Sequence, residues 1–178
     1  VTGHRDIPGE DTEMLKAAVR QFFVQIQHSY PKSPFKLISG LAEGADRLVA
    51  EVALDVGFDL LAALPMIQKD YEQDFESAQS LEHFRYLVSR AESCFAVPHE
   101  ESIEDATQSR DLKYLALGRY IAKNSQIVIA LWDGVSEQVG ADGSTRILTG
   151  GTADVVRLCC NGIFSEDHNH ILVPEITE

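Results

Sequence analysis

The sequence predicts an α/β fold, with a three-layer, open parallel sheet and helices on both faces. Short apolar runs with strand character alternate along the 178-residue chain with longer segments whose apolar residues recur at helical spacing. These helical segments are long enough for right-handed crossovers between parallel strands. The arrangement is typical of a doubly wound, Rossmann-like sheet. No repeat or linker interrupts it, so residues 1–178 are predicted to form a single domain.

The strands are predicted from apolar runs bounded by glycine, proline or polar residues. In chain order they are residues 1–2, 35–39, 59–65, 93–97, 126–132 and 170–176. The first is interpreted as the end of a strand, and whether native residues precede Val1 is left open. The run 126–132, QIVIALW, has the strongest strand character in the chain.

The helices are predicted from apolar residues spaced three or four apart. In the first helix Leu15, Phe22 and Ile26 fall on one face, and Pro31 closes the segment. Gly57 is expected to end the second helix. In chain order the predicted helices are residues 11–28, 43–56, 70–90 in two pieces, 109–123 and a segment that starts with GGTADVVRLCC at residue 150. The predicted loops are residues 98–108, to which no role is assigned, and 133–148.

Composition argues against several classes of function. The chain has 15 Lys and Arg against 28 Asp and Glu, and its net charge of -13 argues against duplex nucleic acid as a partner. A small anionic ligand remains compatible, because backbone amides at a helix start can hold it whatever the net charge. No run reaches the roughly 18 apolar residues of a membrane span, and no signal-like leader is visible, so no membrane partner is expected.

The cysteines and histidines indicate neither disulfides nor metal. Cys94, Cys159 and Cys160 are odd in number and form no disulfide framework, so a cytoplasmic location is expected. His168 and His170 have no evident third ligand, so neither a metal nor another cofactor is predicted. The oligomeric state is left open, and a homo-oligomer is compatible with the sequence.

Four stretches are predicted at the carboxyl edge of the sheet, where open α/β sheets bind their ligands. They are Gly3-His4-Arg5-Asp6, the segment from Ser39 to Gly44, Trp132-Asp133-Gly134, and Thr149-Gly150-Gly151-Thr152. The first three follow strands directly and the fourth opens a helix. We therefore expect any binding site to be assembled from these four stretches.

Two interpretations of the segment from Ser39 to Gly44 stay open. Gly40 lets the chain turn after the strand, Gly44 lets backbone or ligand approach the next helix, and Ser39 and Glu43 add polar groups. The segment is either a phosphate or ribose site, or an ordinary turn whose glycines permit close packing of helix against strand. A pair of glycines after a strand does not decide between the two.

The stretch from Thr149 to Thr152 is the stronger candidate. Two glycines and two hydroxyls at a helix start bring amide groups, the positive end of the helix dipole and side-chain donors to one point. Capping of the helix by threonine requires no ligand and is the alternative. A double glycine is a poor way to build a cap alone, so anion binding is favoured.

Two further positions suit a nucleotide. Arg5, next to His4, is able to hold a phosphate through two hydrogen bonds, although a surface ion pair with Asp6 or Asp11 is the alternative. Asp133 is placed to accept hydrogen bonds from ribose hydroxyls, as acidic residues at strand ends often do. Its alternative role is to form the turn before the following glycine.

Together these stretches resemble the SLOG superfamily, the Rossmann-like group that joins the DNA-processing protein Smf/DprA and the Lonely-guy (LOG) phosphoribohydrolases. SGLAEGAD, from Ser39, is similar to the Ser-Gly-Leu-Ala-x-Gly-x-Asp segment of the Smf/DprA branch, and VTGHRD is similar to the first-strand turn of the superfamily. TGGTADVV, from Thr149, resembles the glycine-rich helix start of the LOG branch. The resemblance covers nearly the whole chain and implies a pocket for a nucleotide or nucleotide-derived ligand between these turns.

The resemblance leaves catalysis open. LOG enzymes carry the motif P-G-G-x-G-T-x-x-E, whose Glu assists cleavage of the N-glycosidic bond of a nucleoside monophosphate. When that motif is aligned on Gly151 and Thr152, Val155 takes the position of the Glu. Asp154 lies one residue earlier, which is about 100° around the helix.

Three functions are therefore weighed, in the following order. The first is a nucleotide-binding sensor domain, and the second is an N-glycosidic hydrolase with Asp154, Asp133 or Glu43 as its carboxylate. The third is a single-strand nucleic-acid-binding or scaffold protein of the Smf/DprA kind. That third function has only a stripe of cations in its support, namely Arg5, Arg47, Arg110, Lys113 and Arg119. The predicted ligand-binding residues are Gly3, His4, Arg5, Ser39, Gly40, Glu43, Gly44, Asp133, Thr149, Gly150, Gly151 and Thr152.

Overall fold

The computed structural model describes residues 1–98, 106–135, 137–139, 145–147 and 151–161 of the chain. In chain order the elements are β1 (Thr2–Gly3), α1 (Gly9–Ser29), β2 (Lys36–Ser39), α2 (Ala45–Asp55), β3 (Asp59–Leu64), α3 (Gln68–Tyr71), the 3-10 turn η1 (Glu72–Asp74), α4 (Ala78–Arg90), β4 (Ser93–Ala96), α5 (Ala106–Asn124), β5 (Ala130–Leu131), β6 (Glu137–Val139), β7 (Thr145–Ile147) and α6 (Gly151–Asn161). This alternation confirms the predicted α/β fold.

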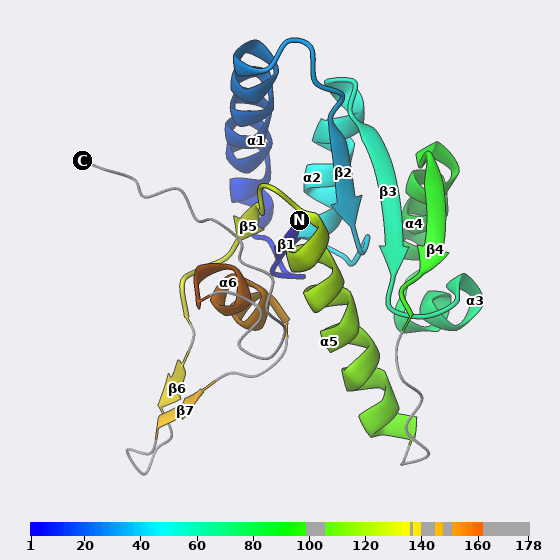
Figure 1. Cartoon of the computed structure of the whole chain (residues 1–178). Coiled ribbons are helices and arrows are strands. Elements are labelled where there is room, and N and C mark those ends of the chain that lie inside the picture. The colour runs from blue at the N-terminus through cyan, green and yellow to red at the C-terminus, as the bar shows by residue number, and fades with distance from the viewer. Residues whose placement is uncertain (99–105, 136, 140–144, 148–150, 162–178) are drawn as a thin grey trace.

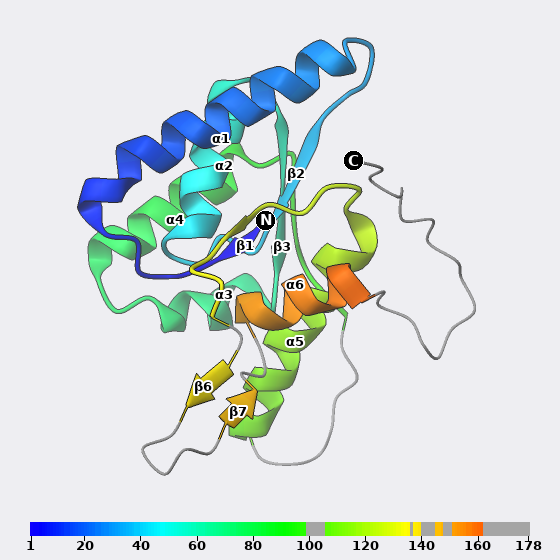
Figure 2. The ribbon, with the colours of Figure 1, turned by 90° about the vertical axis from the view of Figure 1, so that its left-hand side faces the viewer.

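The parallel strands form two groups that meet at β1. β2, β3 and β4 pair in parallel in that order, and β1 pairs in parallel with β5. The amine of Val1 donates a hydrogen bond to the carbonyl oxygen of Ile38 at 2.8 Å, so that β1 lies beside β2 (Figure 1). The helices cover both faces, with α1, α2 and α4 on one and α5 and α6 on the other (Figure 2).

This topology places a change of direction at β1. From β1 the chain moves through β2 and β3 to β4, and its helices stay on one face. α5 then crosses the other face and leads to β5 on the far side of β1. In open α/β sheets ligands bind outside the carboxyl ends of the strands at such a point. The turn after β1 is therefore the place to look for a site.

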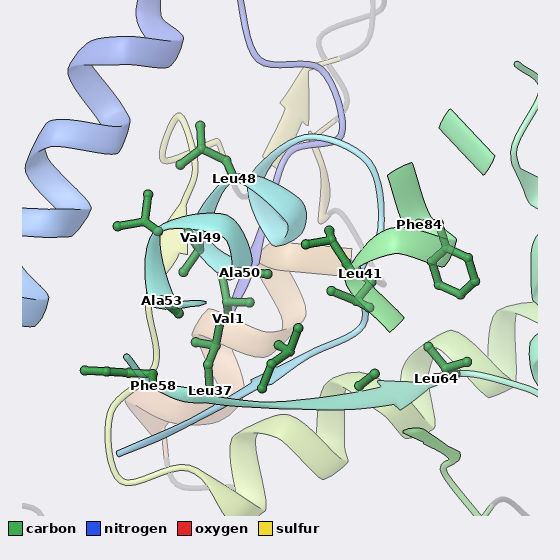
Figure 3. Packing of buried hydrophobic residues seen from close by; sticks show 14 of the residues in the cluster. Val1, Leu37, Leu41, Leu48, Val49, Ala50, Ala53, Phe58, Leu64 and Phe84 are labelled. Atoms are coloured by element: carbon green, nitrogen blue, oxygen red, sulfur yellow. The ribbon is translucent and has the colours of Figure 1, made fainter. Parts of the chain in front are cut away.

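The core lies between α2 and the strands β2 and β3. Val49, Ala50 and Ala53 of α2 are fully buried and face Leu37 and Phe58 (Figure 3). Small residues dominate this face of α2, so the helix lies close to the sheet. Its first turn is consequently held in a fixed position relative to the strand ends.

Two predicted elements differ from the structure. The predicted strand 126–132 is reduced to Ala130–Leu131, since β5 pairs only with the two residues of β1, and Ile127 is 52% exposed. The predicted loop 133–148 contains the antiparallel pair β6 and β7, with Val139 opposite Thr145. Its glycines indicated a loop, but the β-branched residues on either side of them are typical of a hairpin. The predicted strand 170–176 lies outside the described residues.

None of the helices in the described part of the chain has both the length and the hydrophobicity needed to cross a membrane.

The turn after β1 and the start of α2 are packed backbone against backbone. Ala45 donates its amide hydrogen to the carbonyl oxygen of His4 at 3.0 Å. A Cβ atom added to Gly44 would lie 2.2 Å from the carbonyl oxygen of Arg5, and one added to Gly3 would lie 2.3 Å from the Cβ of Ala45. Gly44 also has a φ of 75°, which side chains disfavour. These glycines therefore have the packing role that the sequence left as one of two interpretations.

Gly44→Ala is expected to destabilise the protein by roughly 2–4 kcal/mol, because the methyl group meets backbone atoms and φ is positive. Urea unfolding followed by circular dichroism measures the change. Gly9→Ala is the matched control, since an added Cβ there has no neighbour within 4 Å and the residue begins a helix. Equal stability of the two variants would contradict this account of the contact.

Candidate functional site

A cavity of about 730 Å³ opens at the carboxyl end of β1, between the first turn of α2 and the helices α5 and α6. Five predicted site residues line it: Gly3, Arg5, Gly151, Thr152 and Asp154. The structure thus brings together the first and the fourth of the predicted stretches, which are separated by nearly the whole chain.

The start of α6 forms one wall of this cavity. Gly151 has a φ of 64°, and a Cβ atom placed there would have no neighbour within 4 Å, so the backbone is open to the cavity. Thr152 is 9% exposed and its hydroxyl accepts a hydrogen bond from the hydroxyl of Thr2 at 3.3 Å. Thr149 and Gly150 lie outside the described residues. The first amide groups of a helix have no partner within it, and with the helix dipole they attract an anion.

Asp154 lies in the same turn of α6. Its carboxylate accepts a hydrogen bond from Arg157 at 2.5 Å in an ion pair along the helix. An acidic residue in the first turn stabilises the helix by interacting with its dipole. This pairing gives Asp154 a structural role in addition to its position at the cavity.

Arg5 forms the opposite edge of the cavity. Its guanidinium carbon lies 5.5 Å from the centre of the Tyr114 ring, and within the described residues it makes no ion pair with any carboxylate, Asp6 and Asp11 included. Tyr114 is held in turn by Asp74, which accepts hydrogen bonds from the Tyr114 hydroxyl and from Arg110. Arg5 therefore offers a cation that has no acidic partner, positioned by an aromatic ring on α5.

Asp46 is a buried carboxyl group in the same cavity. It is 8% exposed, and its Oδ2 accepts a hydrogen bond from the amide of Ala42 at 3.4 Å. Burial raises the pKa of Asp46 to about 6, although the amine of Val1, the amide of Ala42 and Arg5 favour the charged form. Asp46 ends the SGLAEGAD segment and was not predicted to be a site residue. Its place in the first turn of a helix that faces the sheet was the signal for it.

Tyr71 supplies a donor without an acceptor. The side chain is fully buried, lines the cavity and packs edge-on against Phe75, Phe84 and Tyr114. Within the described residues its hydroxyl has no hydrogen-bond partner. Burial raises the pKa of Tyr71, so the group stays protonated. An unsatisfied buried donor costs about 1–3 kcal/mol, and a bound acceptor would remove that cost. The sequence carried no signal that would have identified Tyr71.

Two of the predicted residues lie beneath the cavity without lining it. The hydroxyl of Ser39, fully buried, accepts a hydrogen bond from the amide of Leu41 at 3.1 Å and donates one to the carbonyl oxygen of Asp46 at 3.3 Å. Gly40 leaves room for Leu117 and Asp46, whose side chains lie 2.8 and 3.2 Å from the position of an added Cβ. Both residues therefore fix the start of α2 in place.

The remaining predicted residues lie elsewhere. His4 and Asp133 form an exposed pair, with Nε2 and Oδ1 3.1 Å apart, and neither lines the cavity. Asp133 also accepts a hydrogen bond from the amide of Val135 at 2.9 Å, and these two contacts lower its pKa. Glu43 and Gly44 line a second cavity on the other side of α2. Of the three predicted carboxylates, only Asp154 reaches the first cavity.

The cations proposed as a nucleic-acid-binding stripe do not form one exposed surface. Arg47 is 4% exposed, and Arg110 makes an ion pair with Asp74. A groove that follows a nucleic-acid backbone needs accessible positive charge along its length. These two positions do not provide it.

Comparison of the chain with models of known protein families and with curated protein sequences gave no significant match. The function is therefore argued from the cavity itself.

Asp46→Asn is expected to stabilise the protein near neutral pH and to change its stability little near pH 4. The folded pKa of about 6 lies above the ordinary value of 3.8, so protonation favours folding and this contribution is lost as the pH rises through 6. A shift of about two pKa units corresponds to roughly 3 kcal/mol. Urea unfolding at several pH values measures it, with exposed Asp59→Asn as the control. A parallel pH dependence in wild type and Asp46→Asn would contradict the assignment.

Proposed function

We propose that this chain is a binding domain of the SLOG type that holds a nucleotide or a nucleotide-derived molecule in the cavity at the end of β1. One observation carries the proposal. The open helix start at Gly151, the cation of Arg5 without an acidic partner and the unpartnered hydroxyl of Tyr71 all line one cavity at the point where the strand order changes direction. Each of these groups donates hydrogen bonds, and phosphate and ribose oxygens accept them.

The cavity has a polar and an apolar side. The phosphate is assigned to the amides of Gly151 and Thr152, with Arg5 as the neutralising cation. Asp46 and Tyr71, at the base of the cavity, are assigned to the sugar or to a polar edge of the base. Apolar side chains of α5 and α6 provide the surface for the base, and these are Leu115, Leu117, Ile121, Val155 and Leu158. The volume of about 730 Å³ is in the range of small-molecule sites.

Ligand screening tests the proposal directly. Thermal shift and calorimetry with nucleoside monophosphates, cyclic nucleotides and ADP-ribose are expected to find at least one compound that stabilises the folded protein, because a ligand bound only to that state raises Tm. Arg5→Gln is expected to weaken that binding about tenfold and Thr152→Val about threefold, through loss of a charged and of a neutral donor.

Arg20→Gln is the matched control, since Arg20 pairs with Asp55 on the surface and does not line the cavity. Absence of stabilisation by every phosphorylated nucleoside would refute the proposal. Binding that is unchanged in both Arg5→Gln and Thr152→Val would show that the ligand occupies another site.

Tyr71→Phe separates ligand binding from folding. Removing a hydroxyl that has no partner within the described residues is expected to leave the free protein as stable as wild type, or up to about 1 kcal/mol more stable. The same change is expected to weaken nucleotide binding several-fold. Calorimetry and urea unfolding on one preparation give both values. A large loss of stability in the free protein would show that the hydroxyl has a partner inside the fold.

Hydrolysis of an N-glycosidic bond is the second candidate, and Asp46 is the observation that favours it. A buried carboxyl group with a pKa near 6, in a cavity, has the property required of a general acid at neutral pH. Incubation with nucleoside monophosphates followed by chromatography detects released base. Release that is lost in Asp46→Asn but kept in Asp133→Asn would support hydrolysis, whereas no release by wild type leaves binding as the function.

A further inference from the structure

A second cavity, of about 570 Å³, lies on the other side of α2, between the first turns of α1, α2 and α4. It shares only Arg5 with the cavity described above. Its lining is mainly polar, and it includes Glu43, Arg47, Ser77, Ser80 and His83. The proposed nucleotide site makes no use of these side chains.

Arg47 is the unusual residue of this second cavity. It is 4% exposed, and its guanidinium carbon lies 4.5 Å from the centre of the Phe75 ring. Its Nε donates to the carbonyl oxygen of Leu41 at 3.0 Å, and its Nη1 donates to the carbonyl oxygen of Ser80 at 2.8 Å and to the Ser80 hydroxyl at 2.9 Å. None of these acceptors is a carboxylate, and Nη2 has no acceptor at all among the described residues.

A buried guanidinium of this kind is costly. Taking a charge out of water is compensated in most proteins by an opposite charge in direct contact. The described Asp and Glu residues make no ion pair with Arg47. An anionic group in the cavity would give Nη2 an acceptor and bring the missing negative charge.

The start of α4 adds donors beside Arg47. The hydroxyl of Ser77 caps this 13-residue helix by accepting a hydrogen bond from the amide of Ser80 at 3.0 Å. The amides that precede Ser80 in the first turn and the dipole of α4 favour a negative group at this end. The hydroxyl of Ser80 donates a hydrogen bond to the carboxylate of Glu43 while it accepts one from Arg47. Glu43 therefore occupies the position that an external anion would take.

The other charges around this cavity are mostly paired. Lys16 and His83 both contact the carboxylate of Glu51, at 2.9 and 2.7 Å. Asp6 is exposed to solvent, and Arg5 is stacked against Tyr114 toward the first cavity. Arg47 is thus the cation of this cavity that has no acid in direct contact within the described residues.

We propose that the second cavity is an anion-binding site, in which a phosphate or carboxylate group binds Nη2 of Arg47, the Ser80 hydroxyl and the start of α4, and displaces the carboxylate of Glu43 from Ser80. The site is independent of the proposed nucleotide site, because its polar groups lie on the opposite side of α2.

Titration of the ¹⁵N-labelled chain with inorganic phosphate, followed by NMR, tests this site. Saturable shifts are expected at the Arg47 Nε–H and at the backbone amides of Ala78 and Gln79. Arg47→Met, which keeps an apolar stem over Phe75, and Ser80→Ala are expected to weaken binding at least about tenfold and about threefold, respectively. Glu43→Gln is expected to change binding in the opposite direction and tighten it about fivefold, since it removes the competing negative charge.

Ser80→Ala keeps the test decisive if Arg47→Met does not fold, because the carbonyl oxygen of Ser80 and the Ser77 cap remain. Thr152→Val is the control for the first cavity and is expected to leave these shifts unchanged. The same titration with acetate distinguishes the source of the anion, since saturation by acetate alone assigns the site to carboxylates and saturation by phosphate to phosphates. Linear shifts with both anions, or equal affinity in wild type, Ser80→Ala and Glu43→Gln, would overturn the proposal.

Discussion

The close contact between the turn after β1 and the first turn of α2 is the constraint on which the rest of the carboxyl edge depends. Gly3 and Gly44 let the two backbones approach until the amide of Ala45 bonds the carbonyl oxygen of His4 at 3.0 Å. No side chain fits between them. Because this contact fixes the helix start against the strand end, it also fixes the wall that separates the two cavities and places Arg5 at the border of both.

Two adjacent residues use that wall in opposite directions. Consecutive residues of an α-helix point about 100° apart, and Asp46 lines the first cavity while Arg47 lines the second. Both are more than nine-tenths buried. Burial disfavours both charges, so the pKa of Asp46 is raised and that of Arg47 is lowered. A fold that keeps two such groups at the ends of its strands is less stable than one with apolar residues there, which is typical of functional sites.

The sequence predicted the strands and helices where periodicity was strong, and it failed where the chain environment decided. The helix from Gly9 to Ser29 and the strands β2 to β4 follow the spacing of apolar residues. β5 was overestimated, because the length of a strand depends on its partner and β1 offers only two residues. Asp133 was assigned to a ligand from its position after a strand, but the structure pairs it with His4. No pattern in the sequence reports such local partners.

By itself the sequence determined the α/β class, the turns at the carboxyl edge and the resemblance of those turns to one superfamily. These follow from periodicity, glycine positions and local motifs, which are properties of neighbouring residues. Only the tertiary structure decided that Gly151 and Arg5 share a cavity, that Glu43 lies outside it, and that the hydroxyl of Tyr71 and Nη2 of Arg47 are buried without partners in the described part of the chain. Burial and pairing depend on contacts between residues far apart in the chain, and those contacts exist only in the folded structure.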